Sequence, residues 1–124
     1  MKKVIATPDA PKAVGPYSQA IEVNGTLYIS GQIPVNPANG EVQTEITAAA
    51  HQSLKNIGAI LKEAGMTYDN VVKTTVLLAD IADFKAVNEV YAEYFTGDKP
   101  ARACYQAAAL PLGVKVEIEA IAVR

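Results

Sequence analysis

The chain has 124 residues, of which 50% are hydrophobic and only 6% aromatic, and its formal net charge is −2. This length suits one domain, residues 1–124, with a core of small aliphatic side chains. The Lys and Arg residues are scattered, so no basic stripe favours nucleic-acid binding. The apolar stretch at residues 4–6 is too short for a signal peptide, and no apolar run is long enough to span a membrane. We therefore expect a cytoplasmic protein.

The first half of the chain predicts a β-hairpin followed by a long helix. Residues 18–30 form the hairpin, because Asn24-Gly25 is a two-residue turn sequence between β-type segments. Residues 36–41 (NPANGE) indicate a loop. Apolar residues then recur at helical spacing from 46 to 64, and Gly65 stands where a helix ends in a left-handed residue. The predicted stripe consists of Ile46, Ala50, Leu54, Ile57, Leu61 and Ala64.

The second half predicts a strand, a helix and two closing strands. Residues 71–79 are a β-branched run typical of a central strand. Asp80 suits the N-cap of the next helix, and Asp83 suits its positive end. Residues 101–110 and 115–123 are the closing strands, linked by a segment that contains Pro and Gly. The apolar face of the predicted helix carries Phe84, Val87, Tyr91 and Tyr94.

This order of elements predicts an α+β fold. A single mixed sheet would carry the two helices on one of its faces. The chain has no third helix to cover the other face, so the simplest cover is another copy of the chain.

The sequence offers no standard metal or cofactor site. His51 is the only histidine and lies beside the stripe of the first helix, which is typical of a surface or boundary residue. Without pairs of His or Cys, a zinc site lacks ligands, and nothing places a serine near His51 for a catalytic triad. No glycine-rich phosphate loop or dinucleotide fingerprint is present. We expect no metal and no cofactor, although an ion site built only from carboxylates stays open.

One arginine heads an otherwise apolar predicted strand. Arg102 and Cys104 share a face of that strand, as Glu117 and Glu119 do in the last strand. A buried arginine is unfavourable unless an anion meets it. Arg102 therefore forms a structural ion pair with a glutamate, lies in solvent, or grips the carboxylate of a ligand with its planar fork. In the last case Glu117 is the nearby general acid or base.

The spacing of these residues limits how they can cooperate. If residues 110–114 form a tight turn, Glu117 pairs near residues 106–108, roughly 15–20 Å from Arg102 at ~3.3 Å per residue. Either the link is then not a simple hairpin, or a second chain completes the site. We expect the second chain, which would also cover the open sheet face.

Other residues interrupt the apolar patterns. Asn88 lies on the stripe of the second helix and serves either a helix-to-loop hydrogen bond or a pocket wall. Cys104 is expected to pack as a small hydrophobe rather than to react, since no His or Lys adjoins it. Gly15 and Gly31 stand at loop-to-strand junctions, where they serve turns or let backbone amides approach a ligand, with Tyr17 as a lid.

Five segments occur in one order along almost the whole chain. They are GPYSQA at 15–20, SGQIP at 30–34, Asn88 within 84–95, PAR at 100–102 with Cys104, and VEIEAIAV at 116–123. Each is a weak signal alone, but together they resemble the RidA (YjgF-type) reactive intermediate deaminase family. The resemblance implies a homotrimer with a chorismate-mutase-like fold and pockets at the subunit interfaces.

The resemblance also implies an activity. Members of this family hydrolyse 2-imino acids such as 2-iminobutanoate and 2-iminopropanoate, and their enamine tautomers, to 2-keto acids and ammonia. Pyridoxal-phosphate dehydratases release these short-lived species. By resemblance, Arg102 holds the substrate carboxylate, Glu117 activates the attacking water, and Cys104 lines the pocket. The rest of the pocket is formed by Tyr17, Ser30, Gly31 and Asn88.

Two other functions stay open. A regulatory trimer would bind a 2-keto acid or another carboxylate at Arg102 without catalysis, and Glu117 distinguishes this case because carboxylate binding needs no second carboxylate. A ribonuclease or translation inhibitor is disfavoured by the acidic balance, the single histidine and the lack of a basic stripe. The chain departs from the family pattern at Ala103, Tyr105 and Ala109, which leaves the preferred substrate open.

Overall fold

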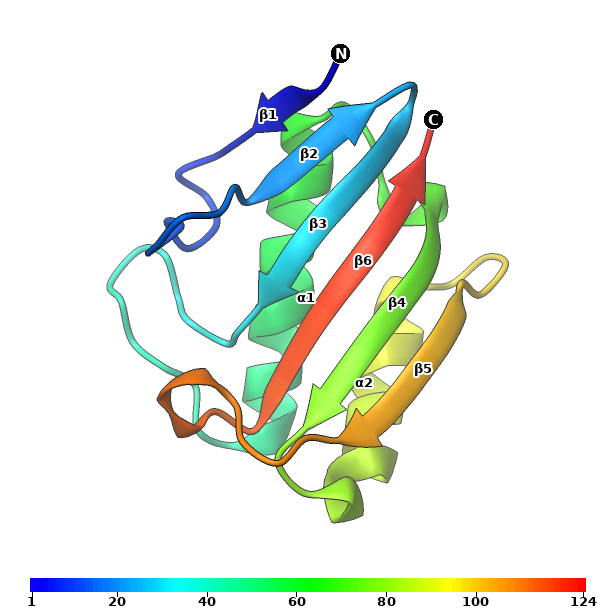
Figure 1. Ribbon diagram of the computed structural model, residues 1–124. Helices are drawn as coiled ribbons and strands as arrows, with labels where there is room; N and C mark the ends of the chain where they lie inside the picture. Colours follow the sequence, from blue (N-terminus) through cyan, green and yellow to red (C-terminus); the bar gives the residue numbers. More distant parts are fainter.

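Six strands form one mixed sheet in the order β1-β2-β3-β6-β4-β5 (Figure 1). The computed structural model describes the whole chain, residues 1–124. Neighbouring strands are antiparallel except for β4 and β5, which are parallel. The strands are β1 (Lys3–Ile5), β2 (Ala20–Val23), β3 (Thr26–Gln32), β4 (Val71–Leu78), β5 (Ala101–Gln106) and β6 (Val116–Val123).

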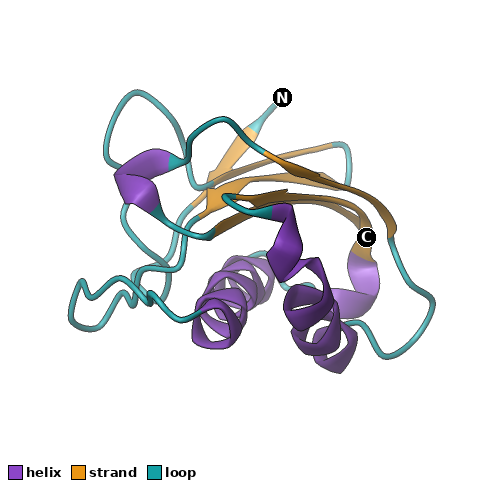
Figure 2. Cartoon of the chain, turned by 90° about the horizontal axis from the view of Figure 1, so that it is seen from below, coloured by secondary structure: helices purple, strands orange, loops and turns teal.

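Two helices, α1 (Ile46–Glu63) and α2 (Phe84–Tyr94), pack against one face of the sheet and leave the other face open (Figure 2). This arrangement confirms the predicted mixed sheet with two helices on one face. Burial along β6 alternates accordingly. Val116 and Ile118 lie under the helices and are fully buried, whereas Glu117 and Glu119 face the open side. No helix is both long enough and apolar enough to cross a membrane.

Local signals explain the first hairpin and α1. Asn24 and Gly25 adopt φ angles of 51° and 80°, as the two-residue turn between β2 and β3 requires. α1 begins after Glu45, whose carboxylate accepts hydrogen bonds from two backbone amides of the first turn. It ends just before Gly65, whose φ is 72°. The predicted stripe faces the core: Ala50, Leu54, Ile57, Leu61 and Ala64 are buried, and Ile46 packs against them.

The second half contains a βαβ unit, which differs from the separate strands predicted there. β4, α2 and β5 follow one another, and β5 pairs with β4 in parallel, as a crossover through a helix requires. β6 pairs with the other side of β4, so β5 and β6 are not neighbours and residues 110–114 do not form a hairpin turn. The predicted strand over 101–110 was also too long. β5 ends at Gln106 because β4, its only partner, ends opposite at Leu78.

A capped turn precedes α2. The Asp80 carboxylate accepts a hydrogen bond of 2.9 Å from the Ala82 amide and so caps a 3-10 turn at Ile81–Asp83, rather than α2 itself. Asp83 occupies the N-cap position of α2 but makes no side-chain hydrogen bond there. Two further 3-10 turns, at Tyr68–Asn70 and Pro111–Gly113, precede β4 and β6.

Candidate functional site

Arg102 extends from the edge strand β5 onto α2, on the helix-covered side of the sheet. Its Nη1 donates a hydrogen bond of 2.8 Å to Oδ1 of Asn88. The guanidinium carbon lies 4.9 Å from the ring centre of Tyr91 and 5.4 Å from that of Phe84. Both distances suit cation–π contacts. The guanidinium is therefore held entirely by neutral side chains of one helix.

No carboxylate of the chain neutralises Arg102. The ion pairs that form elsewhere do not involve it. The predicted alternative of an ion pair with Glu117 or Glu119 is thus not realised within the chain. Asn88 bonds to β5 and not to a loop, so its helix-to-loop alternative was wrong. Arg102 keeps free N–H donors and an unpaired charge, which is what an anionic ligand needs.

Cys104 lies two residues after Arg102 and packs half-buried against the core, as expected. Burial raises the pKa of its thiol, although the charge of Arg102 opposes this shift. The amide of Ala107 donates to the carbonyl of Leu78 at 2.8 Å. Amide directions alternate along a strand, so the Cys104 amide points away from β4 at the free edge of the sheet. The raised pKa of the thiol disfavours the reactive thiolate. The Cys104 amide, which does not bond to β4, is available to a ligand.

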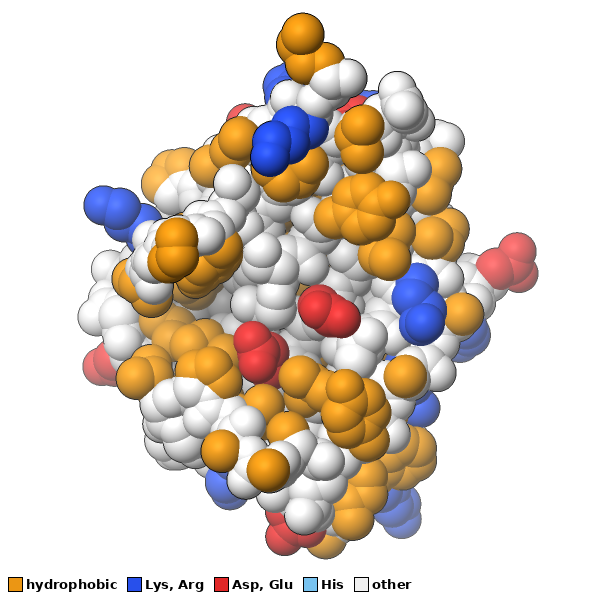
Figure 3. All heavy atoms as spheres, viewed as in Figure 1, with side chains coloured by type: hydrophobic (Ala, Val, Ile, Leu, Met, Phe, Trp, Pro, Cys, Tyr) orange, Lys and Arg blue, Asp and Glu red, His pale blue; other side chains and the backbone are white.

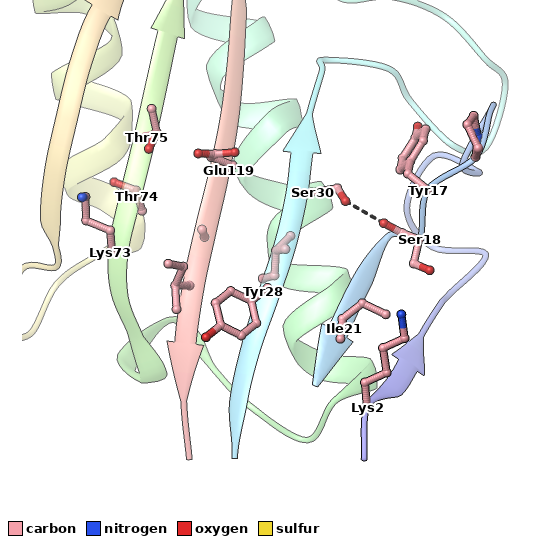
Figure 4. Close-up of a pocket in the computed structure, with 14 residues that line it drawn as sticks. Lys2, Tyr17, Ser18, Ile21, Tyr28, Ser30, Lys73, Thr74, Thr75 and Glu119 are labelled. Carbon is pink, nitrogen blue, oxygen red and sulfur yellow. Dashed lines mark hydrogen bonds between the residues drawn. The ribbon is translucent and has the colours of Figure 1, made fainter. Parts of the chain in front are cut away.

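The carboxyl group of Glu117 lies over the backbone of β3. The register of β3 with β6 shifts, so that Ser30 and Gly31 form a bulge. A Cβ on Gly31 would lie 2.3 Å from Oε2 of Glu117, so only glycine permits this approach. The Ser30 hydroxyl donates a 2.6 Å hydrogen bond to the carbonyl of Ser18, which fastens the bulge to the preceding loop (Figure 4).

The surroundings of Glu117 shift the protonation equilibrium of its carboxyl group. Burial raises the pKa of the Glu117 carboxyl above its ordinary value of 4.5, and repulsion from the neighbouring Glu119 adds to the shift. A carboxyl with a raised pKa exchanges its proton nearer to neutral pH, as a general acid or base must.

Tyr17 borders three hollows on the surface. One has a volume of about 510 Å³ and lies on the open face, where Ser30 and Glu119 also line it (Figure 4). Another, of about 330 Å³, is lined by both Tyr17 and Gly31. The third, of about 620 Å³, lies among the N-terminal residues and contains no other predicted site residue. Tyr17 is 50% exposed, so its ring lies over the surface and not in the core.

The structure divides the predicted site residues into two groups. The arginine group, on the helix-covered side at the edge of β5, consists of Arg102, Cys104 and Asn88. The glutamate group, on the open side, consists of Glu117, Gly31, Ser30 and Tyr17. Figure 3 shows acidic side chains in the middle of that open face, with hydrophobic ones around them. Arg102 and Glu117 point to opposite sides of the sheet, with β4 between their strands, so they do not meet within one chain.

Three residues around Arg102 were not among the predicted site residues. Phe84 and Tyr91 belonged only to an apolar stripe, although their spacing with Asn88 (i, i+4, i+7) places all three on one face of α2. The hydroxyl of Thr74 lies 2.7 Å from that of Tyr91. No sequence signal could connect Thr74 with Tyr91, because their contact depends on how α2 packs on β4.

His51 is half-buried, at the boundary between core and surface, as expected. Its Nδ1 is 2.7 Å from the Tyr94 hydroxyl, and its Nε2 is 3.9 Å from the carboxylate of Glu93. His51 belongs to neither group. The chain has no cluster of three or more His, Cys, Asp or Glu side chains suited to a metal ion.

Together these features define a small α+β protein with an arginine that has no carboxylate partner at a sheet edge and a carboxyl group of raised pKa on the open face. The family model described as Endoribonuclease L-PSP matches residues 7–124. The chain belongs to this family, which is the YjgF or RidA family that the sequence motifs resemble, so the resemblance is confirmed.

Relatives match over nearly the full length. The chain is 58% identical over 125 residues to a Mus musculus protein named 2-iminobutanoate/2-iminopropanoate deaminase, covering 100% of this chain and 93% of that protein. The structure of the YjgF gene product from E. coli has 49% identity, a TM-score of 0.96 and coverage of 98% of each chain. The structure of E. coli TdcF with bound serine has 44% identity, a TM-score of 0.96 and the same coverage of both chains. The α+β fold is thus shared with solved relatives.

Proposed function

We propose that this protein hydrolyses reactive 2-imino acids, such as 2-iminobutanoate and 2-iminopropanoate, to 2-keto acids and ammonia. The observation that carries the proposal is the unpaired guanidinium of Arg102, held by neutral side chains beside the outward-facing amide of Cys104. Such donors suit the α-carboxylate that imino acids and keto acids share. The mouse relative's name supports the reaction, and serine bound to TdcF supports a small ligand with the same carboxylate.

Glu117 transfers protons in this proposal. In the first stage it takes a proton from water as the water oxygen bonds to the imine carbon, and passes that proton to the imine nitrogen, giving a carbinolamine. In the second stage it removes the hydroxyl proton and delivers it to nitrogen, so the C–N bond breaks and ammonia leaves the keto acid. One water is consumed, and no oxidant or reductant is needed. Positioned proton transfer of this kind contributes ~10²–10⁴-fold.

In this proposal the reaction takes place between two chains, which is supported by the position of Arg102 and Glu117 on opposite sides of one sheet. The arginine group at the edge of one chain faces the glutamate group on the open face of the next. Two different surfaces then meet, so the contact is heterologous, and in this proposal the rotation between successive chains closes it into a ring. A ring of three, packed in the chorismate-mutase-like manner, covers every open face. A native mass measurement tests this assembly, and a monomer at working concentration would contradict it.

The remaining predicted residues take their places in the same pocket. Asn88 and Cys104 line the side that belongs to the first chain, and Tyr17, Ser30 and Gly31 line the side of its neighbour. Residues 1–124 act as one domain in this proposal, and the reaction takes place in the cytoplasm. The free thiol of Cys104 suits a reducing compartment, and a short-lived substrate has to be met where it is made. Cell fractionation tests the location.

A trapping assay tests the activity. A threonine dehydratase generates 2-iminobutanoate in the presence of semicarbazide, and the yield of trapped adduct is followed with and without this protein. We expect the wild-type protein to suppress the adduct and Arg102→Ala to leave it unchanged. If neither protein changes the adduct while a trimer is present, the deaminase proposal fails and a regulatory carboxylate-binding trimer takes its place.

We do not propose an endoribonuclease activity, which the family description names, for this chain. The arginine group suits one small anion, and His51 bonds to Tyr94 outside both groups. The test is digestion of a single-stranded RNA before and after a second purification step. If the specific activity is undiminished after that step, the chain is a ribonuclease and this exclusion is wrong.

A further inference from the structure

Three residues of α2 form a cradle around the Arg102 guanidinium. Phe84, Asn88 and Tyr91 project from one helix face, two as rings under the cation and one as a hydrogen-bond acceptor. None of them is charged, so the cradle directs the guanidinium without neutralising it. The members differ in how firmly they are held. Phe84 is 38% exposed, whereas Tyr91 is only 7% exposed.

Tyr91 is fixed from the opposite side by a buried hydrogen bond. Its hydroxyl lies 2.7 Å from Oγ1 of Thr74, which is 0% exposed in the middle of β4. Thr74 pairs with Arg102 in the β4–β5 register, so the anchor lies directly beside the residue that the ring supports. The Tyr91 ring also packs against Phe95 at a centroid distance of 4.5 Å. Burying a hydroxyl group is unfavourable unless it has a hydrogen-bond partner, and here the hydroxyls of Tyr91 and Thr74 are each other's partners.

We propose that Tyr91, anchored by Thr74, is a positioning residue that orients Arg102 for the carboxylate of its ligand. This inference rests on the proposed role of Arg102 as the carboxylate receptor. A long arginine side chain has many rotamers, and restricting them before binding removes part of the entropy lost on binding. The Tyr91 ring restricts the guanidinium by packing against one of its faces, and Asn88 accepts a hydrogen bond from one of its N–H groups. The other N–H groups remain free to bind the anion.

Calorimetric binding of two non-reactive ligands separates positioning from general damage. 2-Oxobutanoate carries the carboxylate, and 2-oxobutanamide is its neutral counterpart of nearly the same shape. We expect Tyr91→Leu to weaken 2-oxobutanoate about 10-fold, within the range of cation–π contacts in partly desolvated sites, and to change 2-oxobutanamide less than about 2-fold. Thr74→Val and Tyr91→Phe, which remove only the anchoring hydrogen bond, should each weaken the anion alone, by about 3-fold.

Tyr94→Leu is the matched control on the same helix. Tyr94 bonds to His51 and does not contact Arg102, so its replacement loosens α2 without touching the cradle. Two results would overturn the positioning role. The first is equal weakening of both ligands by the three variants Tyr91→Leu, Tyr91→Phe and Thr74→Val. The second is unchanged binding of 2-oxobutanoate in all three. Arg102→Ala distinguishes this failure from failure of the proposed function. If Arg102→Ala keeps the preference for the anion, the carboxylate receptor itself is wrong.

Discussion

Replacing Gly31 by alanine is expected to lower kcat while leaving the fold intact. The added Cβ would lie 2.3 Å from Oε2 and 2.9 Å from Cδ of Glu117. Ordinary van der Waals contact begins at 3.4 Å, so the carboxylate has to retreat by 3.4 − 2.3 = 1.1 Å. A displacement of this size costs on the order of 10²-fold in rate when the displaced group takes part in the chemistry. Because the clash meets the flexible end of a side chain, we expect little loss of stability.

The trapping assay at saturating imine supply measures this effect as kcat, and circular dichroism follows the fold. Gly97→Ala is the matched control, since its Cβ would lie 3.4 Å from a carboxylate oxygen of Asp69 and outside both groups. We expect the control to keep wild-type kcat and Gly31→Ala to lose about 10²-fold. Wild-type kcat in folded Gly31→Ala would refute the role given to the Glu117 carboxylate, because its position would then not matter.

Three further predictions follow from the same geometry. Arg102→Lys removes the planar fork that binds a carboxylate through charge-assisted hydrogen bonds, so we expect kcat/KM to fall about 10–100-fold. Arg124→Lys is the control and should keep the wild-type value. An unchanged kcat/KM in Arg102→Lys would exclude the carboxylate role. Glu119→Gln removes one cause of the raised pKa of Glu117, so the acid limb of the pH–kcat profile should move to lower pH, and an unmoved limb would exclude that cause. The burial and Glu119 repulsion that raise the pKa of Glu117 mean that stability falls as pH rises from about 4.5 through that pKa, where no guanidinium faces the carboxyl. In an Arg102→Ala background, Glu117→Gln should therefore melt above its parent at pH 7 and lose this advantage at pH 4; the reverse order would contradict the shift.

Local signals made the elements predictable from the sequence. Asn24-Gly25 and Gly65 mark a turn and a helix end through their own backbone preferences, without reference to the rest of the chain. The pairing of β5 with β4, in contrast, is not determined by the backbone preferences of single residues. Its partner is set by the crossover through α2, and the strand-helix-strand order of residues 71–106 is itself the signature of a parallel βαβ unit. That order, taken as a unit, would have excluded a hairpin turn at residues 110–114.

The candidate site was predictable in its parts but not in its arrangement. Strand alternation places Arg102 with Cys104, and Glu117 with Glu119, because it relates residues within one strand. It does not relate the faces of two different strands. The register through β4, in which Thr74 pairs with Arg102 and Leu77 with Glu117, is needed to show that the two groups lie on opposite sides. The aromatic cradle depended in the same way on the packing of α2 over β4.

The central claim is that each site takes Arg102 from one chain and Glu117 from its neighbour, and mixing of two inactive variants tests it most directly. Arg102→Ala and Glu117→Gln are dissociated together in equal amounts and reassembled, and native mass measurement confirms mixed rings. In random rings, about a quarter of the sites combine an intact arginine with an intact glutamate. We predict that the mixture recovers about a quarter of wild-type activity. Mixed rings with no more activity than either variant alone would contradict the shared site.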